Sequence, residues 1–257
     1  MSNKTALITG ASSGIGQAFA RLLAVKGYDL ILTARREERL ATLCAELEKS
    51  HNVKALYVVA DLADPDSPQR IYEYSQKMGI NVDLLINNAG FGRLQSFKDI
   101  DDGQNHSMIQ VLISSLTELT RLFLRPMLDR DKGGILNVAS IGADVSAPGF
   151  AVYAASKAYV VHFTDCLAME LMGTGVTATV VLPGATRTEF SDVAGMRFNK
   201  ALDMVSMDAE KVATLGYKAW LKGKVKYTVG CLNRVQVYLM RMMPRCCAKK
   251  MVSIYTQ

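Results

Sequence analysis

Short apolar runs alternate with longer helix-type patterns along most of this chain, and that alternation restricts the folds it can adopt. The apolar runs cover residues 6–9, 30–34, 55–59, 84–87, 135–140, 176–183 and 226–229. The helix-type patterns cover residues 15–27, 37–50, 67–78, 105–129, 150–172 and 207–222. Continuous apolar runs are typical of strands buried on both faces, so the pattern predicts a parallel sheet covered by helices. Ligands bind such sheets beside the carboxyl ends of the strands, where we expect the functional residues.

The stretch TGASSGIG follows the first predicted strand and opens the first predicted helix. Gly10 suits a tight turn, while Gly14 and Gly16 leave room for a phosphate and for close packing of the helix on the sheet. The start of the helix offers unpaired N–H groups, and Ser12 and Ser13 add hydroxyl donors. This placement predicts a dinucleotide-binding turn, and a glycine-rich loop without a ligand is the alternative.

Two arginines, Arg35 and Arg36, follow the second predicted strand after Ala34. In many sheets of this kind an acidic residue at this place binds the ribose hydroxyls, and it would repel an additional 2′-phosphate. Arginines instead pair with that phosphate. The position therefore favours NADP over NAD, and a solvated basic pair at the start of a helix is the alternative.

Further motifs follow the glycine turn in a fixed order. They are DL at 61–62, NNAG at 87–90, Ser140, YAASK at 153–157 and PGATRT at 183–188. With this ordered set the chain closely resembles the short-chain dehydrogenase/reductase family of the Tyr-x-x-x-Lys type, over almost its whole length to about residue 230. The resemblance implies an α/β fold with a Rossmann-like, doubly wound parallel sheet, flanked by helices in a single domain.

The resemblance also implies roles for individual residues. The implied catalytic residues are Ser140, Tyr153 and Lys157. The implied cofactor-binding residues are Gly10, Ser12, Ser13, Gly14, Ile15, Gly16, Arg35, Arg36, Asp61, Leu62, Asn88, Ala89, Gly90, Tyr153, Lys157, Pro183, Gly184, Thr186 and Thr188. Judged from the residues alone, NNAG is also a plain strand-ending turn and Ser140 a cap, and both alternatives stay open.

Tyr153 and Lys157 lie one helical turn apart, so their side chains share a helix face. The lysine ammonium and an oxidised nicotinamide would both stabilise phenolate, so we expect the pKa of Tyr153 to fall below its ordinary value of ~10. The resemblance then implies that Tyr153 protonates the oxygen of a carbonyl substrate and that Ser140 hydrogen-bonds the same oxygen. A buried tyrosine beside a solvated lysine is the alternative.

Leu112 departs from the family pattern, because family members commonly carry an asparagine at the matching position. That asparagine usually holds a water between the active-site lysine and solvent, and leucine has no polar atom for this purpose. Two hypotheses follow: a working NADP-dependent reductase with an altered proton relay, or a catalytically weak NADP-binding regulatory protein. The intact Ser140, Tyr153 and Lys157 favour the enzyme.

Residues 185–206 follow the sixth predicted strand, in the region that covers the substrate in this family. Met196, Phe198, Leu202 and Met204 suggest an apolar lid, and a pair of helices packed on the core is the alternative. The lid favours a small carbonyl or alcohol substrate of apolar or acyl-like character.

The net charge of +6 is unevenly distributed, because ten lysines and arginines and no acidic residue follow Glu210. We predict an NADP-binding domain over residues 1–230, including the lid, and a basic amphipathic extension over residues 231–257 that packs on it. Contact of this extension with anionic lipid, in a peripheral membrane-associated lipid-type reductase, is the alternative. Nucleic acid is not expected, because no recognised binding motif accompanies the charge.

Other features narrow the class of protein. Three scattered histidines and five cysteines without zinc-type spacing predict no metal site and a reduced, cytoplasmic protein. The N-terminal apolar run is too short for a signal peptide, and no stretch is expected to reach the ~20 apolar residues of a membrane-spanning helix. The family resemblance implies a homodimer or homotetramer formed through the two long central helices.

Overall fold

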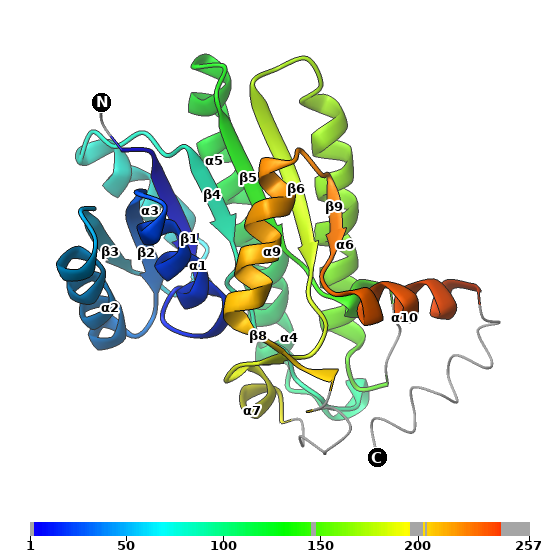
Figure 1. The fold of residues 1–257 in the computed structure, drawn as a ribbon. Helices are drawn as coiled ribbons and strands as arrows, with labels where there is room; N and C mark the ends of the chain where they lie inside the picture. Colours follow the sequence, from blue (N-terminus) through cyan, green and yellow to red (C-terminus); the bar gives the residue numbers. More distant parts are fainter. Residues whose placement is uncertain (1–2, 145–147, 196–202, 204, 243–257) are drawn as a thin grey trace.

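A seven-stranded parallel sheet with the strand order β3-β2-β1-β4-β5-β6-β9 forms the centre of the molecule (Figure 1). The computed structural model describes residues 3–144, 148–195, 203 and 205–242, apart from the side chains of Asp102 and Arg241. The strands of the sheet are β1 (Thr5–Thr9), β2 (Asp29–Ala34), β3 (Ala55–Val59), β4 (Leu84–Asn87), β5 (Gly133–Val138), β6 (Val176–Leu182) and β9 (Lys226–Thr228). Nearly every residue of β1, β4 and β6 is buried, as the continuous apolar runs predicted.

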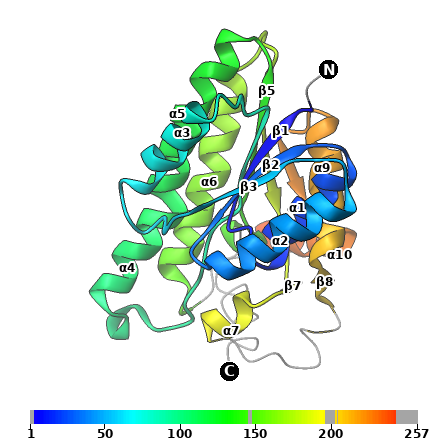
Figure 2. The same cartoon turned by 90° about the vertical axis from the view of Figure 1, so that its left-hand side faces the viewer.

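Helices cover both faces of the sheet, so the predicted doubly wound α/β fold in a single domain is confirmed (Figure 2). Helices α1, α2 and α9 cover one face, around a core that includes Phe19 and Tyr217. Helices α3, α5 and α6 cover the other, around Phe123 and Leu167. The helices are α1 (Gly14–Val25), α2 (Glu37–Ser50), α3 (Ser67–Lys77), α4 (Asp102–Ile109), α5 (Ser115–Asp129), α6 (Ala151–Glu170), α7 (Phe190–Ala194), α9 (Ala209–Leu221) and α10 (Cys231–Met242), with short 3-10 turns η1 (Phe97–Asp99) and η3 (Ile141–Ala143).

The single helix predicted over residues 105–129 is composed of three segments. A π-helical segment, η2 (Gln110–Ser114), joins α4 to α5. The continuous run Gly103–Asp129 has 27 residues and is long and apolar enough to cross a membrane. The expectation that no stretch reaches this length is therefore wrong, but half of its most apolar window is buried inside the fold, as in a core helix.

A chain of buried amides and hydroxyls ties the centre of the sheet to α5 and α6. Asn87 on β4 donates from Nδ2 to Oδ1 of Asn137 on β5 at 2.9 Å and to Oγ1 of Thr120 on α5 at 3.0 Å. Asn137 donates to Oγ1 of Thr164 on α6 at 2.9 Å. All four side chains are buried. Because a buried polar group costs free energy unless it is hydrogen-bonded, these bonds fix how the helices sit on the strands.

We expect Asn137→Ala to lower the free energy of unfolding by about 2–4 kcal/mol, because it removes two hydrogen bonds from a buried polar chain. Urea denaturation followed by circular dichroism measures this change. The matched control is Asn81→Ala, since Asn81 accepts its hydrogen bond from Arg130 at the surface. It should cost less than about 1 kcal/mol, and equal losses in the two variants would contradict a special contribution from the buried chain.

Candidate active site

A cleft opens at the carboxyl ends of β1 and β4, where the strand order reverses. Asn88, directly after β4, donates from Nδ2 to the carbonyl oxygen of Thr9 at 2.9 Å and from its N–H to the Thr9 hydroxyl at 3.0 Å. The N–H of Ala89 bonds the same hydroxyl at 2.9 Å. These bonds hold the two strand ends together at the place where an open α/β sheet binds its ligand.

The glycine turn between β1 and α1 lies close against this strand end. Gly10 has a φ of +66°, and a Cβ built on it would lie 2.8 Å from Cα of Ala89. A Cβ on Gly16 would lie 2.3 Å from the carbonyl oxygen of Gly10. A side chain at either position would therefore collide with the backbone and push α1 away from the sheet.

The cleft has a volume of about 1150 Å³ and runs from Arg35 and Arg36, at the end of β2, to Tyr153 and Lys157 on α6. Every predicted catalytic and cofactor-binding residue lines it, with the exception of Gly16. Gly16 lies behind the turn, and its contact with Gly10 makes it a packing residue.

Lys157 and Tyr153 occupy the inner end of the cleft. Lys157 is buried and donates from Nζ to the carbonyl oxygen of Val138, the last residue of β5, at 2.8 Å. The ring of Tyr153 lies between Phe150 and Phe190, at centroid distances of 5.7 Å and 5.4 Å. A strand carbonyl thus fixes the ammonium, and two aromatic rings fix the phenol.

Ser140 lies between the end of β5 and η3. Its Oγ accepts the N–H of Gly142 at 3.0 Å and caps η3, as the alternative reading of the sequence allowed. It also hydrogen-bonds Tyr153. Because a hydroxyl has one hydrogen and two lone pairs, the bond from Gly142 occupies a lone pair, and the O–H donates to the oxygen of Tyr153.

Burial decides the pKa values in this part of the cleft. It raises the pKa of Tyr153 to about 12, and the hydrogen bond with Ser140 acts in the opposite direction without offsetting it. It lowers the pKa of Lys157 to about 8. The expectation that Lys157 depresses the pKa of Tyr153 is therefore wrong for the protein by itself. Nζ lies 5.8 Å from the centre of the tyrosine ring, and desolvation is the larger of the two effects on the pKa of Tyr153.

Leu112 is buried in η2 and packs against Gly90. A Cβ built on Gly90 would touch Cδ2 of Leu112 at 2.8 Å and would lie 3.5 Å from Nζ of Lys157. The apolar side chain of Leu112 therefore lies near Lys157, at the position where the family resemblance implies the amide of an asparagine.

The cleft also contains residues that the sequence analysis missed. Phe150 and Phe190 add apolar surface, while Asn233 and Gln236 reach the cleft from α10. Asn233 packs against the backbone of Gly184. Phe150 directly precedes α6 and Phe190 lies two residues after PGATRT, so their positions in the sequence could have indicated that both line the cleft. No sequence pattern indicated that α10 contacts Gly184.

Residues 185–206 are described only in part. They begin with β7 (Thr186–Arg187), which pairs in parallel with β8 (Met207–Asp208), and continue with α7. Phe190 and Val193 of α7, and Val205, line the cleft. The predicted lid residues Met196, Phe198, Leu202 and Met204 lie outside the described residues, as does the predicted extension from residue 243.

Known proteins resemble this chain in sequence and in fold. The model of the short chain dehydrogenase family matches residues 4–196. The chain belongs to the short-chain dehydrogenase family. Sulfoacetaldehyde reductase 2 of Chromohalobacter salexigens is 38% identical to it over 239 residues, which cover 90% of this chain and 92% of that protein.

Two solved structures of short-chain dehydrogenases share the whole fold. The one from Sphingobium yanoikuyae, in complex with NADPH, is 27% identical with a TM-score of 0.82, over 94% of this chain and 97% of that one. The one from Burkholderia phymatum, in complex with NAD, is 26% identical with a TM-score of 0.83, over 93% of each chain. The family predicted from the motifs is thus confirmed, and this short-chain dehydrogenase is an oxidoreductase of the class that interconverts C=O and CH–OH groups.

The lowered pKa of Lys157 predicts how stability depends on pH. In the unfolded state Lys157 has its ordinary pKa of 10.5, whereas in the folded state its pKa is about 8. Between these values the unfolded state binds more protons, so stability rises with pH. We expect the unfolding free energy of the wild type, relative to Lys157→Met, to rise by about 2–3 kcal/mol across this window. Denaturation curves at a series of pH values measure the difference, and a constant difference would contradict the lowered pKa.

Proposed function

We propose that this short-chain dehydrogenase uses NADP to transfer a hydride between the nicotinamide and a carbonyl or secondary alcohol, with Tyr153 as general acid/base. One observation carries the proposal. Ser140, Tyr153 and Lys157 meet at one end of a continuous cleft whose other end holds Arg35 and Arg36. A reductase among the relatives, and solved relatives that bind NADPH or NAD, support a nicotinamide cofactor.

The cleft fits a phosphorylated dinucleotide along its length. Helix α1 begins at Gly14 on the cleft wall and carries no acidic side chain in its first turn, which suits a pyrophosphate. Arg36 donates from Nη2 to Ser12 Oγ at 3.1 Å and to Ser13 Oγ at 2.7 Å, so three donor side chains gather where a 2′-phosphate would lie. Asp61, which is also a predicted cofactor-binding residue, lines the same cleft.

The residues at the inner end handle the substrate oxygen. When bound, the nicotinamide supplies or accepts the hydride. Ser140 donates a hydrogen bond to the carbonyl oxygen and orients it, and Tyr153 gives that oxygen a proton. Because its pKa is raised to about 12, the Tyr153 phenol carries its proton at neutral pH and has it available for the carbonyl oxygen. Lys157, held by the carbonyl of Val138, stays beside the phenol and would also help to hold the cofactor.

The substrate end of the cleft is apolar. Phe91, Phe150, Phe190, Val193 and Val205 line it. This lining supports an apolar or acyl-like carbonyl compound as substrate. A catalytically weak regulatory protein is less well supported, because the complete catalytic trio lines the same cleft as the cofactor-binding residues.

The remaining assignments extend this proposal to the whole chain. Residues 1–230 form the cofactor-binding domain with residues 185–206 as substrate lid, and residues 231–257 form an extension of it. Family membership supports a homodimer or homotetramer in the cytoplasm, assembled through α5 and α6.

We expect Tyr153→Phe to lower turnover by at least about 100-fold while the dissociation constant of NADPH changes by less than about 2-fold, because only the proton donor is lost. Decay of NADPH absorbance over a panel of ketones and aldehydes measures turnover, and the same panel with NADH tests the cofactor preference. Tyr159→Phe is the control, since Tyr159 is exposed on the same helix and bonds Thr117. Undiminished turnover in Tyr153→Phe would contradict the assignment, and NADPH binding by the wild type without turnover would favour a regulatory protein.

Helix α10 supports a further part of this proposal, contact with anionic membranes. The helix extends away from the sheet (Figure 1) and buries Asn233, Val237 and Met240 against the domain. Its opposite face is apolar and exposed, and consists of Leu232, Val235, Tyr238, Leu239 and Met242. Since ten basic and no acidic residues follow Glu210, this face suits the surface of an anionic bilayer.

We expect the full chain to sediment with vesicles of phosphatidylcholine and phosphatidylserine. The double variant Val235→Ser, Leu239→Ser should bind at least about tenfold less, because it removes two apolar side chains from the exposed face. The control is Met169→Ser with Met172→Ser, an exposed apolar pair at the end of α6. Equal binding by both double variants, or by vesicles without the anionic lipid, would discard membrane contact through α10.

A further inference from the structure

The carboxylate of Glu189 is shared by Arg36, which directly precedes α2, and Arg39, in the first turn of α2. Its Oε2 accepts from Nη1 of Arg36 at 2.7 Å, and its Oε1 accepts from Nη1 of Arg39 at 2.5 Å. The three side chains are about half exposed. Both arginines hold the pKa of Glu189 at about 2, so the group is ionised at any pH at which the enzyme works.

The same Arg36 belongs to the group of donors assigned above to a 2′-phosphate. Its remaining guanidinium nitrogens donate to the hydroxyls of Ser12 and Ser13, and a single side chain therefore serves both the donor group and Glu189. A carboxylate and a phosphate both bind guanidinium through the same N–H groups. An arginine that is already paired with a carboxylate has fewer free donors for the phosphate.

Glu189 also forms part of the wall between two cavities. The main cleft holds Arg36, and a second cavity of about 630 Å³ holds Arg39. Ser12, Ser13, Gly14, Thr188 and Glu189 line both. The carboxylate therefore sits at the rim of the main cleft, beside the seryl hydroxyls, where a bound 2′-phosphate would meet a second negative charge.

The segment that carries Glu189 reaches the other end of the cleft. Glu189 directly precedes α7, whose first residue, Phe190, packs on Tyr153 with ring centroids 5.4 Å apart. Thr188, on its other side, is one of the predicted cofactor-binding residues. The pairing with the two arginines thus holds the chain between a cofactor-binding residue and Phe190, which lines the cleft.

We propose that Glu189 competes with the 2′-phosphate of NADPH for Arg36, and so sets how strongly the enzyme prefers NADPH to NADH. The proposal rests on the NADP assignment made above. Binding of the phosphate exchanges one anion for another on Arg36, while Arg39 keeps its bond to Glu189. Without Glu189 the positive charge of Arg36 is left for the phosphate.

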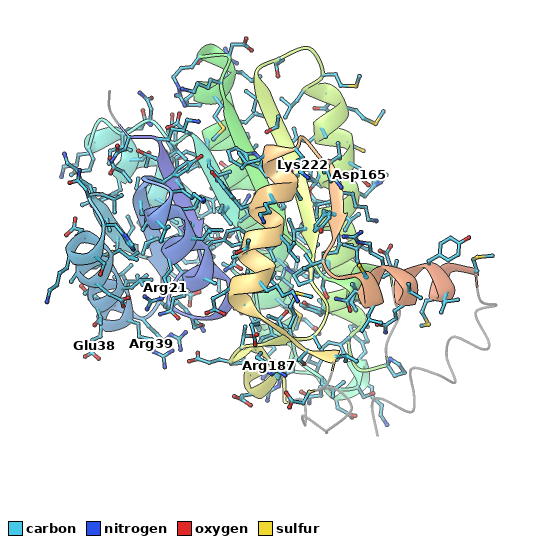
Figure 3. The ribbon with its side chains drawn as sticks, in the orientation of Figure 1. Arg21, Glu38, Arg39, Asp165, Arg187 and Lys222 are labelled. Carbon is cyan, nitrogen blue, oxygen red and sulfur yellow. The ribbon has the colours of Figure 1, made fainter. Side chains whose placement is uncertain are left out.

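The test compares the dissociation constants of NADPH and NADH in the wild type and in Glu189→Gln, by calorimetry at constant ionic strength. We expect Glu189→Gln to bind NADPH about 3- to 10-fold more tightly, the scale of a partly exposed charge pair, and NADH within about 2-fold of the wild type. Glu38→Gln is the matched control, because Glu38 is an exposed carboxylate beside Arg39 on α2 that lines the same second cavity (Figure 3). It removes the same charge and should leave the ratio of the two constants unchanged.

Three outcomes overturn the competition. They are weaker or unchanged NADPH binding by Glu189→Gln, an equal change for both cofactors, and an equal effect of Glu38→Gln. A failure of the underlying NADP assignment gives another result. The wild type would then bind NADH as tightly as NADPH, and Arg36→Ala would change the dissociation constant of neither cofactor. The competition by Glu189 is tested by how Glu189→Gln changes the ratio of the NADPH and NADH dissociation constants. The failure of the NADP assignment is read from the wild type and from Arg36→Ala, so the two failures can be told apart.

Discussion

The hydrogen bonds between Asn88 and the end of β1 are the constraint on which the rest of the cleft depends. They join β1 and β4, the two strands between which the strand order reverses. The side-chain amide of Asn88 donates to the carbonyl oxygen of Thr9, and the backbone N–H of Asn88 donates to the Thr9 hydroxyl. The glycine turn has to pass directly over this joint, which explains why Gly10 has no room for a side chain. Displacing either strand end would move the start of α1, and with it the site assigned to the phosphates.

The inner end of the cleft shows how one strand positions two unlike groups. The carbonyl of Val138 holds the ammonium of Lys157, and Ser140, two residues further on, contacts the phenol of Tyr153. Val138 is the last residue of β5 and Ser140 follows the strand, while Lys157 and Tyr153 lie on α6. The buried chain through Asn137 and Thr164 ties this strand to this helix. The geometry of the reacting groups is therefore inherited from the packing of β5 against α6 and does not depend on a flexible loop.

Most of the fold followed from local sequence patterns, because strands buried on both faces and their covering helices leave strong signals. The catalytic residues were expected from the family resemblance, and the parallel sheet accounts for the edge at which the residues that follow its strands meet. The electrostatics did not follow: the helical spacing of Tyr153 and Lys157 shows that they are neighbours, but not that burial raises the pKa of the phenol and lowers the pKa of the ammonium. Nor could the pairing of Glu189 with Arg36 be read from the chain, because 153 residues separate the partners.

The π-helical segment between α4 and α5 has a consequence for how the molecule can diverge. A π turn takes up one residue more than an α turn, so the faces before and after it are offset by about 100°. Ahead of the offset, Gln104 and Ser107 look into the cleft; beyond it, Leu119 and Phe123 are buried against the sheet. The continuous helical run Gly103–Asp129 thus lines the mouth of the cleft with one face and the hydrophobic core with another. Because the two faces are separate, substitutions at the mouth of the cleft leave the packing of the core unchanged.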